Sequence, residues 1–291
     1  MKTNSILFVG CGDLGARSGK LLLDRGWQVA GLRRDPTRLP PGFARIAGNY
    51  SEAGGLDCIA SLKPDFVVVT PNPSDRSVEG YHRGFTLGAQ NLLAGLGSHH
   101  PQAILWVSST RVYAELDGGW VDETSALSVD DPRALAMIAA ERALLDSAHR
   151  ASAIRFAGIY GYPGGRLLER IRRGELSPAQ PVRYGNRIHR DDCAGFICHL
   201  LEQVAGGGSL APAYNGVDDL PAAQFEVDSW LAAALGVRGE PALTPLSNAP
   251  EGMSTGHKRC SNRLLHSTGY RLLYPDYRSG YGALLGASGQ V

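Results

Sequence analysis

The chain has 291 residues, 43% of them hydrophobic, which is long enough to bury one large core or two modest ones. Its 29 basic and 28 acidic residues leave a formal net charge of +1, which indicates neither a nucleic-acid partner nor a membrane-surface partner. No apolar run approaches the roughly 20 residues of a membrane span, and the five cysteines lack the usual zinc spacings. We therefore expect a soluble cytoplasmic protein with reduced thiols and no bound metal.

The first predicted elements are a buried strand over residues 6–9, a glycine-rich turn and a helix over residues 16–25. In the turn pattern Gly-x-Gly-x-x-Gly the first glycine allows a tight bend, the second opens the backbone to a phosphate, and the third lets the helix pack on the strand. An ordinary glycine turn is the alternative, but the next strand arrives where a βαβ unit requires it. The sequence therefore predicts a dinucleotide-binding turn made of Gly10, Cys11, Gly12, Asp13, Leu14 and Gly15.

A second strand over residues 27–32 ends directly before Arg33 and Arg34. NAD-binding units usually place an acid here, roughly 20 residues past the glycines, against the ribose hydroxyls. An acid would repel a 2′-phosphate, whereas two guanidinium groups would bind it. The sequence therefore favours NADP over NAD, and the alternative is that both arginines are solvated loop residues.

Further strands are predicted over residues 44–47, 66–69, 104–107 and 153–156, alternating with helices over residues 55–62, 84–97 and 132–149. This alternation predicts a doubly wound parallel sheet of the Rossmann type. Ligands of such sheets bind outside the carboxyl ends of the strands. We therefore expect Asn49, Thr70 and Pro71, which follow two of the strands, to line the cofactor cleft, with a mere surface connection as the alternative.

Several ordered motifs accompany the glycine turn. They are Val-Ser-Ser-Thr-Arg-Val-Tyr (107–113), Ile-Arg-Phe-Ala-Gly-Ile-Tyr-Gly (154–161), Asn-Arg-Ile-His-Arg-Asp-Asp (186–192), and segments 258–265 and 274–280. With these motifs the chain resembles the extended short-chain dehydrogenase/reductase superfamily, which includes NAD(P)-dependent nucleotide-sugar epimerases and dehydratases. The resemblance implies an NAD(P)-binding domain over residues 1–156, to which residues 186–217 return, and a smaller, discontinuous substrate-binding part over 157–185 and 218–291. It also implies a homodimer that pairs through the helices 84–97 and 132–149.

The catalytic motif departs from the family. The resemblance implies a Ser or Thr, a Tyr that exchanges a proton with the substrate, and a Lys that lowers the Tyr pKa from about 10 towards neutrality. Ser109 matches the serine. If Glu141 is the Glu that follows the Tyr by eight residues, Arg133 stands at the Tyr position and Met137 at the Lys position. Arginine stays protonated, so Arg133 cannot act as general acid and base, but it can clamp a carboxylate, a phosphate or an oxyanion.

The glycine turn departs too, because Val9 occupies the first place of the usual Gly-x-x-Gly-x-x-Gly, which indicates an atypical branch. One hypothesis is an NADP-dependent epimerase- or dehydratase-like oxidoreductase acting on a small anionic or sugar-like substrate. In it Ser109 donates a hydrogen bond to the substrate, Tyr113 replaces the proton donor and Arg133 anchors an anion; alternatively, the Tyr113 ring only packs below the cleft. Other hypotheses are a protein that senses NADP(H) or a metabolite without turnover, and a scaffold on the same fold.

Two further groups of polar residues stand near these motifs. His189 with Asp191 and Asp192 resembles a metal cluster, although Asp192 reads better as a helix N-cap. Four acids follow Tyr113 and could supply a general base, with solvated loop charges as the alternative: Glu115, Asp117, Asp122 and Glu123.

Overall fold

Two units divide the chain in a computed structural model that describes residues 3–238, 240–241 and 257–288. The first unit comprises Met1–Val112, Leu127–Arg155 and Cys193–Tyr214. The second comprises Tyr113–Ala126, Phe156–Asp192 and Asn215–Val291. Residues 113–126, which the sequence places with the sheet, group with the second unit because strand β6 (Trp120–Val121) pairs with β15 (Arg259–Cys260).

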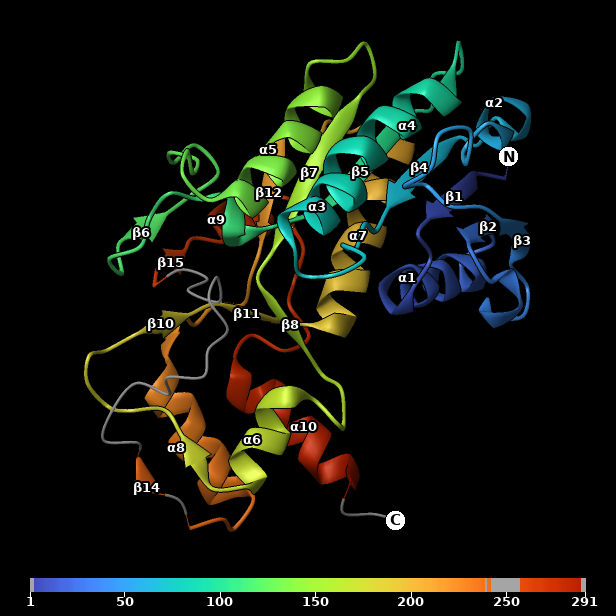
Figure 1. Cartoon of the computed structure of the whole chain (residues 1–291). Helices are drawn as coiled ribbons and strands as arrows, with labels where there is room; N and C mark the ends of the chain where they lie inside the picture. Colours follow the sequence, from blue (N-terminus) through green and yellow to red (C-terminus); the bar gives the residue numbers. More distant parts are fainter. Residues whose placement is uncertain (1–2, 239, 242–256, 289–291) are drawn as a thin grey trace. The chain divides into compact units, whose positions relative to one another are not determined.

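A seven-stranded parallel sheet forms the centre of the first unit, in the order β12-β7-β5-β4-β1-β2-β3 (Figure 1). Its central strands are continuous apolar runs because both faces are covered, and all four residues of β4 are fully buried. The strands are β1 (Ser5–Val9), β2 (Gln28–Arg33), β3 (Ala44–Ala47), β4 (Phe66–Val69), β5 (Ala103–Ser109), β7 (Ala151–Phe156) and β12 (Ala213–Gly216). The predicted doubly wound fold is therefore confirmed.

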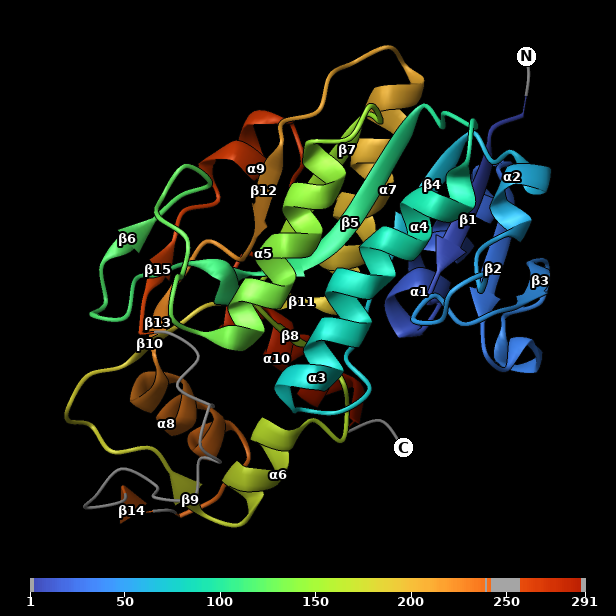
Figure 2. The same cartoon turned by 45° about the horizontal axis from the view of Figure 1, so that its top comes forward.

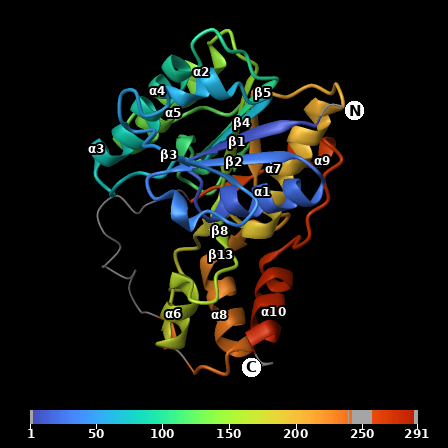
Figure 3. The same ribbon diagram turned by 90° about the vertical axis from the view of Figure 1, so that its right-hand side faces the viewer.

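Helices cover both faces of this sheet. Figure 3 shows α4 (Gly88–Leu96) and α5 (Pro132–Leu145) on one face, and α1 (Asp13–Asp24) and α7 (Arg190–Ala205) on the other. The helix predicted over residues 84–97 starts earlier: α3 (Val78–Tyr81), capped by the Ser77 hydroxyl, continues through a π-helical segment, His82–Leu87, into α4. Short turns complete the unit: α2 (Cys58–Leu62) and the 3-10 turns Pro36–Arg38 and Thr110–Val112.

The second unit is a smaller assembly of helices and two-stranded ladders (Figure 2). Its ladders are β6 with β15, β8 (Gly158–Tyr160) with β11 (Arg187–His189), β10 (Tyr184–Gly185) with β13 (Ala222–Ala223), and β9 (Glu175–Leu176) with β14 (Glu240–Pro241). Its helices are α6 (Arg166–Arg172), α8 (Gln224–Ala234), α9 (Arg263–Ser267) and α10 (Tyr277–Ser288). An apolar core that includes Leu168, Val227 and Tyr277 holds α6, α8 and α10 together.

No helix within the described ranges combines the length and the apolar character that a membrane span requires.

Candidate functional site

The glycine turn between β1 and α1 leaves space at one defined point. Gly10 has φ 69°, and a Cβ there would lie 2.9 Å from the Thr70 carbonyl oxygen, so both the backbone conformation and the close approach require glycine. A Cβ on Gly15 would lie 3.1 Å from the Cys11 sulfur. At Gly12, in contrast, the nearest atom to a Cβ would be the Gly10 carbonyl oxygen at 3.8 Å, and this residue is exposed. The turn therefore presents open backbone at Gly12.

Helix α1 begins at this open point without a side-chain cap. Gly12 is its N-cap and forms no side-chain hydrogen bond, so no capping side chain occupies the N–H groups of the first turn. The pyrophosphate of a dinucleotide fits such an end, because N–H groups and the positive end of the helix dipole face the same space. Asp13 in the first turn forms an ion pair with Arg17 at 3.3 Å, Leu14 is half-buried, and burial raises the pKa of the Cys11 thiol to about 12. Cys11 is therefore a neutral packing residue.

Arg33 lies over the same turn from the end of β2. Its Nη1 donates to the Cys11 carbonyl oxygen at 3.2 Å, while Arg34 is exposed. The next residue, Asp35, is an acid, but its carboxylate accepts from the Thr37 N–H at 3.1 Å and from the Thr37 hydroxyl. The hydroxyl bond is the main cause that lowers the Asp35 pKa. Positive charge from Arg33 therefore borders the glycine turn, and the carboxylate of Asp35 caps its own loop.

Two loops close the turn from the other side. The Thr70 hydroxyl donates to the Gly10 carbonyl oxygen at 2.8 Å, and Pro71 follows it, half-buried. The Tyr50 hydroxyl donates to the Asn72 carbonyl oxygen at 3.0 Å and accepts from the Asn72 N–H at 2.8 Å. Asn49 bonds within its own loop, to Glu52 at 2.6 Å and to the Ser51 N–H. Tyr50 is a site residue that the sequence analysis missed; an aromatic residue directly after a Gly-Asn strand end was its signal.

A chain of polar contacts joins the end of β5 to the start of α5. The Ser109 hydroxyl oxygen accepts from the Arg111 N–H at 3.2 Å, and Arg111 Nε pairs with Asp131 at 2.7 Å. Asp131 also caps α5, accepting from the Arg133 N–H at 3.0 Å, with Pro132 in the first turn as predicted. Within the described residues the Ser109 hydroxyl donates to no protein acceptor. Asp131 and Arg111 thus connect Ser109 at the end of β5 to the first turn of α5. The sequence analysis named neither residue as part of the site.

Arg133 connects α5 to the loop after β4. Its Nε donates to the Arg76 carbonyl oxygen at 2.7 Å, and its Nη groups find no acceptor within the part of the chain that the structure describes. Met137, one turn further, is 2% exposed and packs in the core. The start of α5 therefore carries the guanidinium group of Arg133, and not the Tyr phenol and Lys amine that the family motif implies.

A buried ion pair lies below Ser109. Glu141 of α5 and Arg155 of β7 are 2% and 5% exposed and pair at 2.8 Å, and the Ser108 hydroxyl also donates to Glu141. Through these contacts the pair connects α5 to β5 and β7. The glutamate that the sequence analysis used only to align the motif is therefore a structural anchor.

In the second unit, Tyr113 is 1% exposed, and its hydroxyl donates to Asn215 Oδ1 at 2.6 Å. Its carbonyl oxygen accepts from the buried Lys258 at 3.3 Å. This geometry favours the alternative that the Tyr113 ring packs, since a proton donor must reach its substrate.

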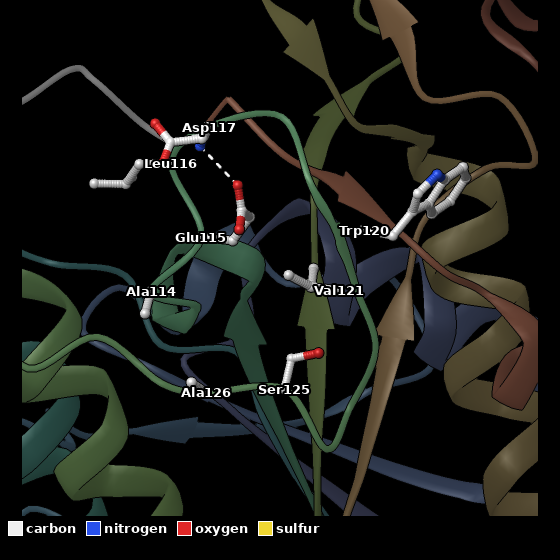
Figure 4. Close-up of a pocket in the computed structure, with 8 residues that line it drawn as sticks. All are labelled: Ala114, Glu115, Leu116, Asp117, Trp120, Val121, Ser125 and Ala126. Atoms are coloured by element: carbon white, nitrogen blue, oxygen red, sulfur yellow. Dashed lines mark hydrogen bonds between the residues drawn. The ribbon is translucent and has the colours of Figure 1, made fainter.

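Two of the four acids that follow Tyr113, Glu115 and Asp117, line a pocket of about 440 Å³, shown in Figure 4, whereas Asp122 and Glu123 do not line it. Glu115 accepts from the Asp117 N–H at 2.7 Å and the Gly119 N–H at 2.9 Å, and these bonds lower its pKa. Glu115 is therefore an anion and not a general base with a raised pKa. The pocket lining is Ala114, Glu115, Leu116, Asp117, Trp120, Val121, Ser125 and Ala126.

The candidate metal cluster does not form. The His189 ring packs against Tyr160 and Tyr274, and Asp192, already inside α7, accepts from the N–H groups of Leu273 and Tyr274 instead of capping the helix. Among the residues with described placement, no group of three His, Cys, Asp or Glu side chains could hold a metal.

No model of a known protein family matches the chain, and no curated protein matches it. Among solved structures, a Methylobacillus flagellatus protein described as an NAD-dependent epimerase/dehydratase is 32% identical, with 99% of this chain and 100% of that chain covered and a TM-score of 0.84. The UDP-glucose 4-epimerase of Thermotoga maritima is 15% identical over 98% of each chain with a TM-score of 0.79. WbmG of Bordetella bronchiseptica, solved with NAD and UDP, is 16% identical over 99% of this chain and 96% of that one, also with 0.79. The last two share the fold, while the identity and coverage of the first show that the chain belongs to the NAD-dependent epimerase/dehydratase family, within the extended short-chain dehydrogenase/reductase superfamily.

Proposed function

We propose that the chain is an NADP-dependent oxidoreductase of the epimerase or dehydratase type, acting on a small anionic or sugar-like substrate. The observation that supports this most is the run of contacts along the carboxyl edge of the sheet. Thr70 bonds to Gly10, Arg133 bonds to the loop after Thr70, and Asp131 and Arg111 connect Arg133 to Ser109. The cofactor turn, a hydroxyl donor and a guanidinium group thus belong to one edge of one unit.

The cofactor is assigned to the turn of Gly10, Gly12 and Gly15, with its pyrophosphate at the start of α1. A 2′-phosphate would pair with Arg33 and Arg34, while the carboxylate of Asp35 bonds to Thr37 in its own loop. A bound nicotinamide supplies or accepts the hydride of the reaction.

The chain's own residues would act on the substrate oxygen and on its charge. The Ser109 hydroxyl, positioned by the Arg111 N–H, would donate a hydrogen bond to the oxygen that becomes an alkoxide, and water would supply the proton that turns this alkoxide into the alcohol. Arg133 would hold a carboxylate or phosphate of the substrate through its Nη groups. Because arginine does not release a proton near neutral pH, Arg133 acts by charge and position only.

A specific observation favours a second function, the sensing of NADP(H) or a metabolite without turnover. With Glu141 taken as the Glu of the family motif, Arg133 stands at the Tyr position and the buried Met137 at the Lys position, and this alignment leaves no Tyr–Lys proton relay. Such a protein needs only the cofactor turn and one of the two arginines beside it.

The test is NADPH oxidation with small aldehydes and ketones, half of them carrying a carboxylate or phosphate and half neutral. Turnover of the anionic set, with kcat lowered by Ser109→Ala and KM raised by Arg133→Gln, supports the enzyme. Arg142→Gln, on an exposed position of the same helix, is the matched control. Tight cofactor binding without turnover of any substrate would favour the sensor.

We propose that the chain forms the homodimer that the family resemblance implies, with α4 and α5 of each protomer in the interface. Leu135 of α5 is 42% exposed and would lie in this interface. Light scattering at micromolar concentration tests this assignment: a monomeric mass would contradict it, and Leu135→Glu should convert a dimer into monomers.

A further inference from the structure

We propose that the second unit binds a small planar carboxylate at Arg259, whose guanidinium group packs on the rings of Trp120 and Tyr184. The Arg259 Cζ atom lies 5.3 Å from the Trp120 ring centroid and 4.8 Å from the Tyr184 ring centroid. Both distances fall within the range of cation–π contact. The three side chains come from separate segments of the chain, so the fold and not the local sequence assembles them.

Backbone pairing sets this arrangement. β15 runs parallel to β6, with Arg259 opposite Trp120, as the two neighbouring strands in Figure 2 show. The Arg259 N–H donates to the Gly119 carbonyl oxygen at 2.8 Å, and its Nε donates to the Gly118 carbonyl oxygen at 2.8 Å. The guanidinium plane is therefore fixed by the main chain as well as by the two rings.

The ring of His257 stacks on the ring of Tyr184. The two rings lie 5.6 Å apart with 10° between their planes, and the Tyr184 N–H donates to His257 Nδ1 at 3.0 Å. Gly118, at φ 85°, gives its N–H to the His257 carbonyl oxygen at 2.6 Å. A Cβ on Gly118 would lie 2.7 Å from the His257 ring, so this close contact also depends on glycine. An arginine held at so many points is preorganised for a ligand.

The Nη groups of Arg259 remain available to bind a ligand. Nε is used, but within the described parts of the chain neither Nη group has an acceptor. Two rings pack against the guanidinium group, and the edge that carries the Nη groups is left for a ligand. That edge matches the two oxygens of a carboxylate or phosphate.

Trp120 and the pocket beside it narrow the ligand class. Trp120 is 58% exposed, so a planar group can stack on the indole. Trp120 is also among the residues that line the pocket of about 440 Å³, and Figure 4 shows its indole turned away from the other lining side chains. Glu115 and Asp117 line the same pocket, and the hydrogen bonds of Glu115 keep its carboxylate charged. Two negative charges disfavour a phosphate dianion more than a carboxylate monoanion, so we assign the carboxylate.

The test is titration of the full-length protein, without cofactor, with benzoate, its neutral analogue benzamide, and phenyl phosphate. Trp120 is the most exposed tryptophan of the described residues, so benzoate should change the intrinsic fluorescence saturably. Benzamide should not bind, phenyl phosphate should bind more weakly, and Trp120→Phe should remove most of the signal. The result is independent of hydride transfer, so its failure would leave the proposed enzyme untouched.

Variants at Arg259 decide the assignment. Arg259→Gln should weaken benzoate binding at least tenfold, whereas Arg263→Gln, at an exposed position nearby, should not. If Arg259→Gln does not fold, Arg259→Lys keeps the charge but loses the planar fork and should also bind more weakly. Wild-type affinity of either Arg259 variant, equal binding of benzamide, or tighter binding of phenyl phosphate would overturn the proposal.

Discussion

Helices α1 and α5 both begin at the carboxyl edge of the same sheet, but only one of them is closed by its own chain. Gly12 starts α1 without a side-chain cap and faces open space. Asp131 starts α5, bonds to the Arg133 N–H and pairs with Arg111. The open end can receive an anionic ligand, while the closed end already holds a carboxylate and carries Arg133 beside it. In the function that we propose, the open start of α1 would hold the cofactor, and Arg133 at the closed start of α5 would hold the charge of the substrate.

The largest effect should come from breaking the anchor behind the closed end. Glu141→Ala leaves the Arg155 guanidinium group buried without its partner, and we expect a loss of about 3–5 kcal/mol in the free energy of unfolding. Urea denaturation measures it. The exposed pair of Glu169 and Arg172 is the matched control, for which Glu169→Ala should cost less than about 1 kcal/mol. Equal losses in the two variants would contradict the anchoring role.

Filling the open end should remove cofactor binding and spare stability. Gly12→Val places a side chain where the pyrophosphate would lie, and we expect NADPH affinity to fall about 100-fold, or roughly 2.7 kcal/mol. Calorimetric titration measures the affinity. Gly164→Val, at a glycine of the second unit that also faces open space, should leave the affinity unchanged. Wild-type affinity of Gly12→Val would show that the phosphates bind elsewhere.

Removing the Asp131 cap at the start of α5 should lower stability by an intermediate amount. Asp131→Ala removes the cap of α5 and the partner of Arg111, and we expect about 1–2 kcal/mol less stability. Asp131→Asn keeps a capping oxygen but loses the charge, so it separates the two contributions in thermal unfolding. An Asn variant as unstable as the Ala variant would mean that the ion pair, and not the cap, dominates.

The smallest effect that we expect is the pH dependence of folding stability caused by His149, at the opposite edge of the sheet of the first unit. Burial, followed by the neighbouring His100 and His99, lowers the pKa of His149 below its usual 6.5. The folded state therefore prefers neutral His149; its contribution is complete above pH 6.5 and is lost as pH falls through the lowered pKa. Unfolding curves between pH 7.5 and 5 should show a shallower loss for His149→Gln than for the wild type. Superimposable pH profiles would contradict this.

The sequence predicts the sheet and the shape of the glycine turn well because both depend on local patterns. Four-residue apolar runs such as Phe66–Val69 can only be buried strands here, and the glycines of the turn have individual steric reasons. Contacts between distant residues could not be predicted in this way. Tyr50 with Asn72, Arg133 with Arg76, and Arg259 with Trp120 each join segments whose relative placement the sequence pattern does not specify.

Tyr113 illustrates the same limit at the candidate active site. Its place in a family motif marks it as a proton donor or as a packing residue, and only its burial and its bond to Asn215 favour packing. Tyr113→Phe should therefore lower stability more than it lowers any turnover that is found.

The central claim, that the open start of α1 with Arg33 holds NADP, is tested most directly by calorimetric titration with NADPH and NADH. The measurement should compare wild type, Arg33→Asp, and Arg38→Asp as the charge-matched control in the 3-10 turn that follows β2. We predict that the wild type binds NADPH at least tenfold more tightly than NADH, that Arg33→Asp abolishes this preference, and that Arg38→Asp keeps it. Equal affinity of the wild type for both cofactors would contradict the NADP assignment, and binding of neither would contradict both the enzyme and the sensor.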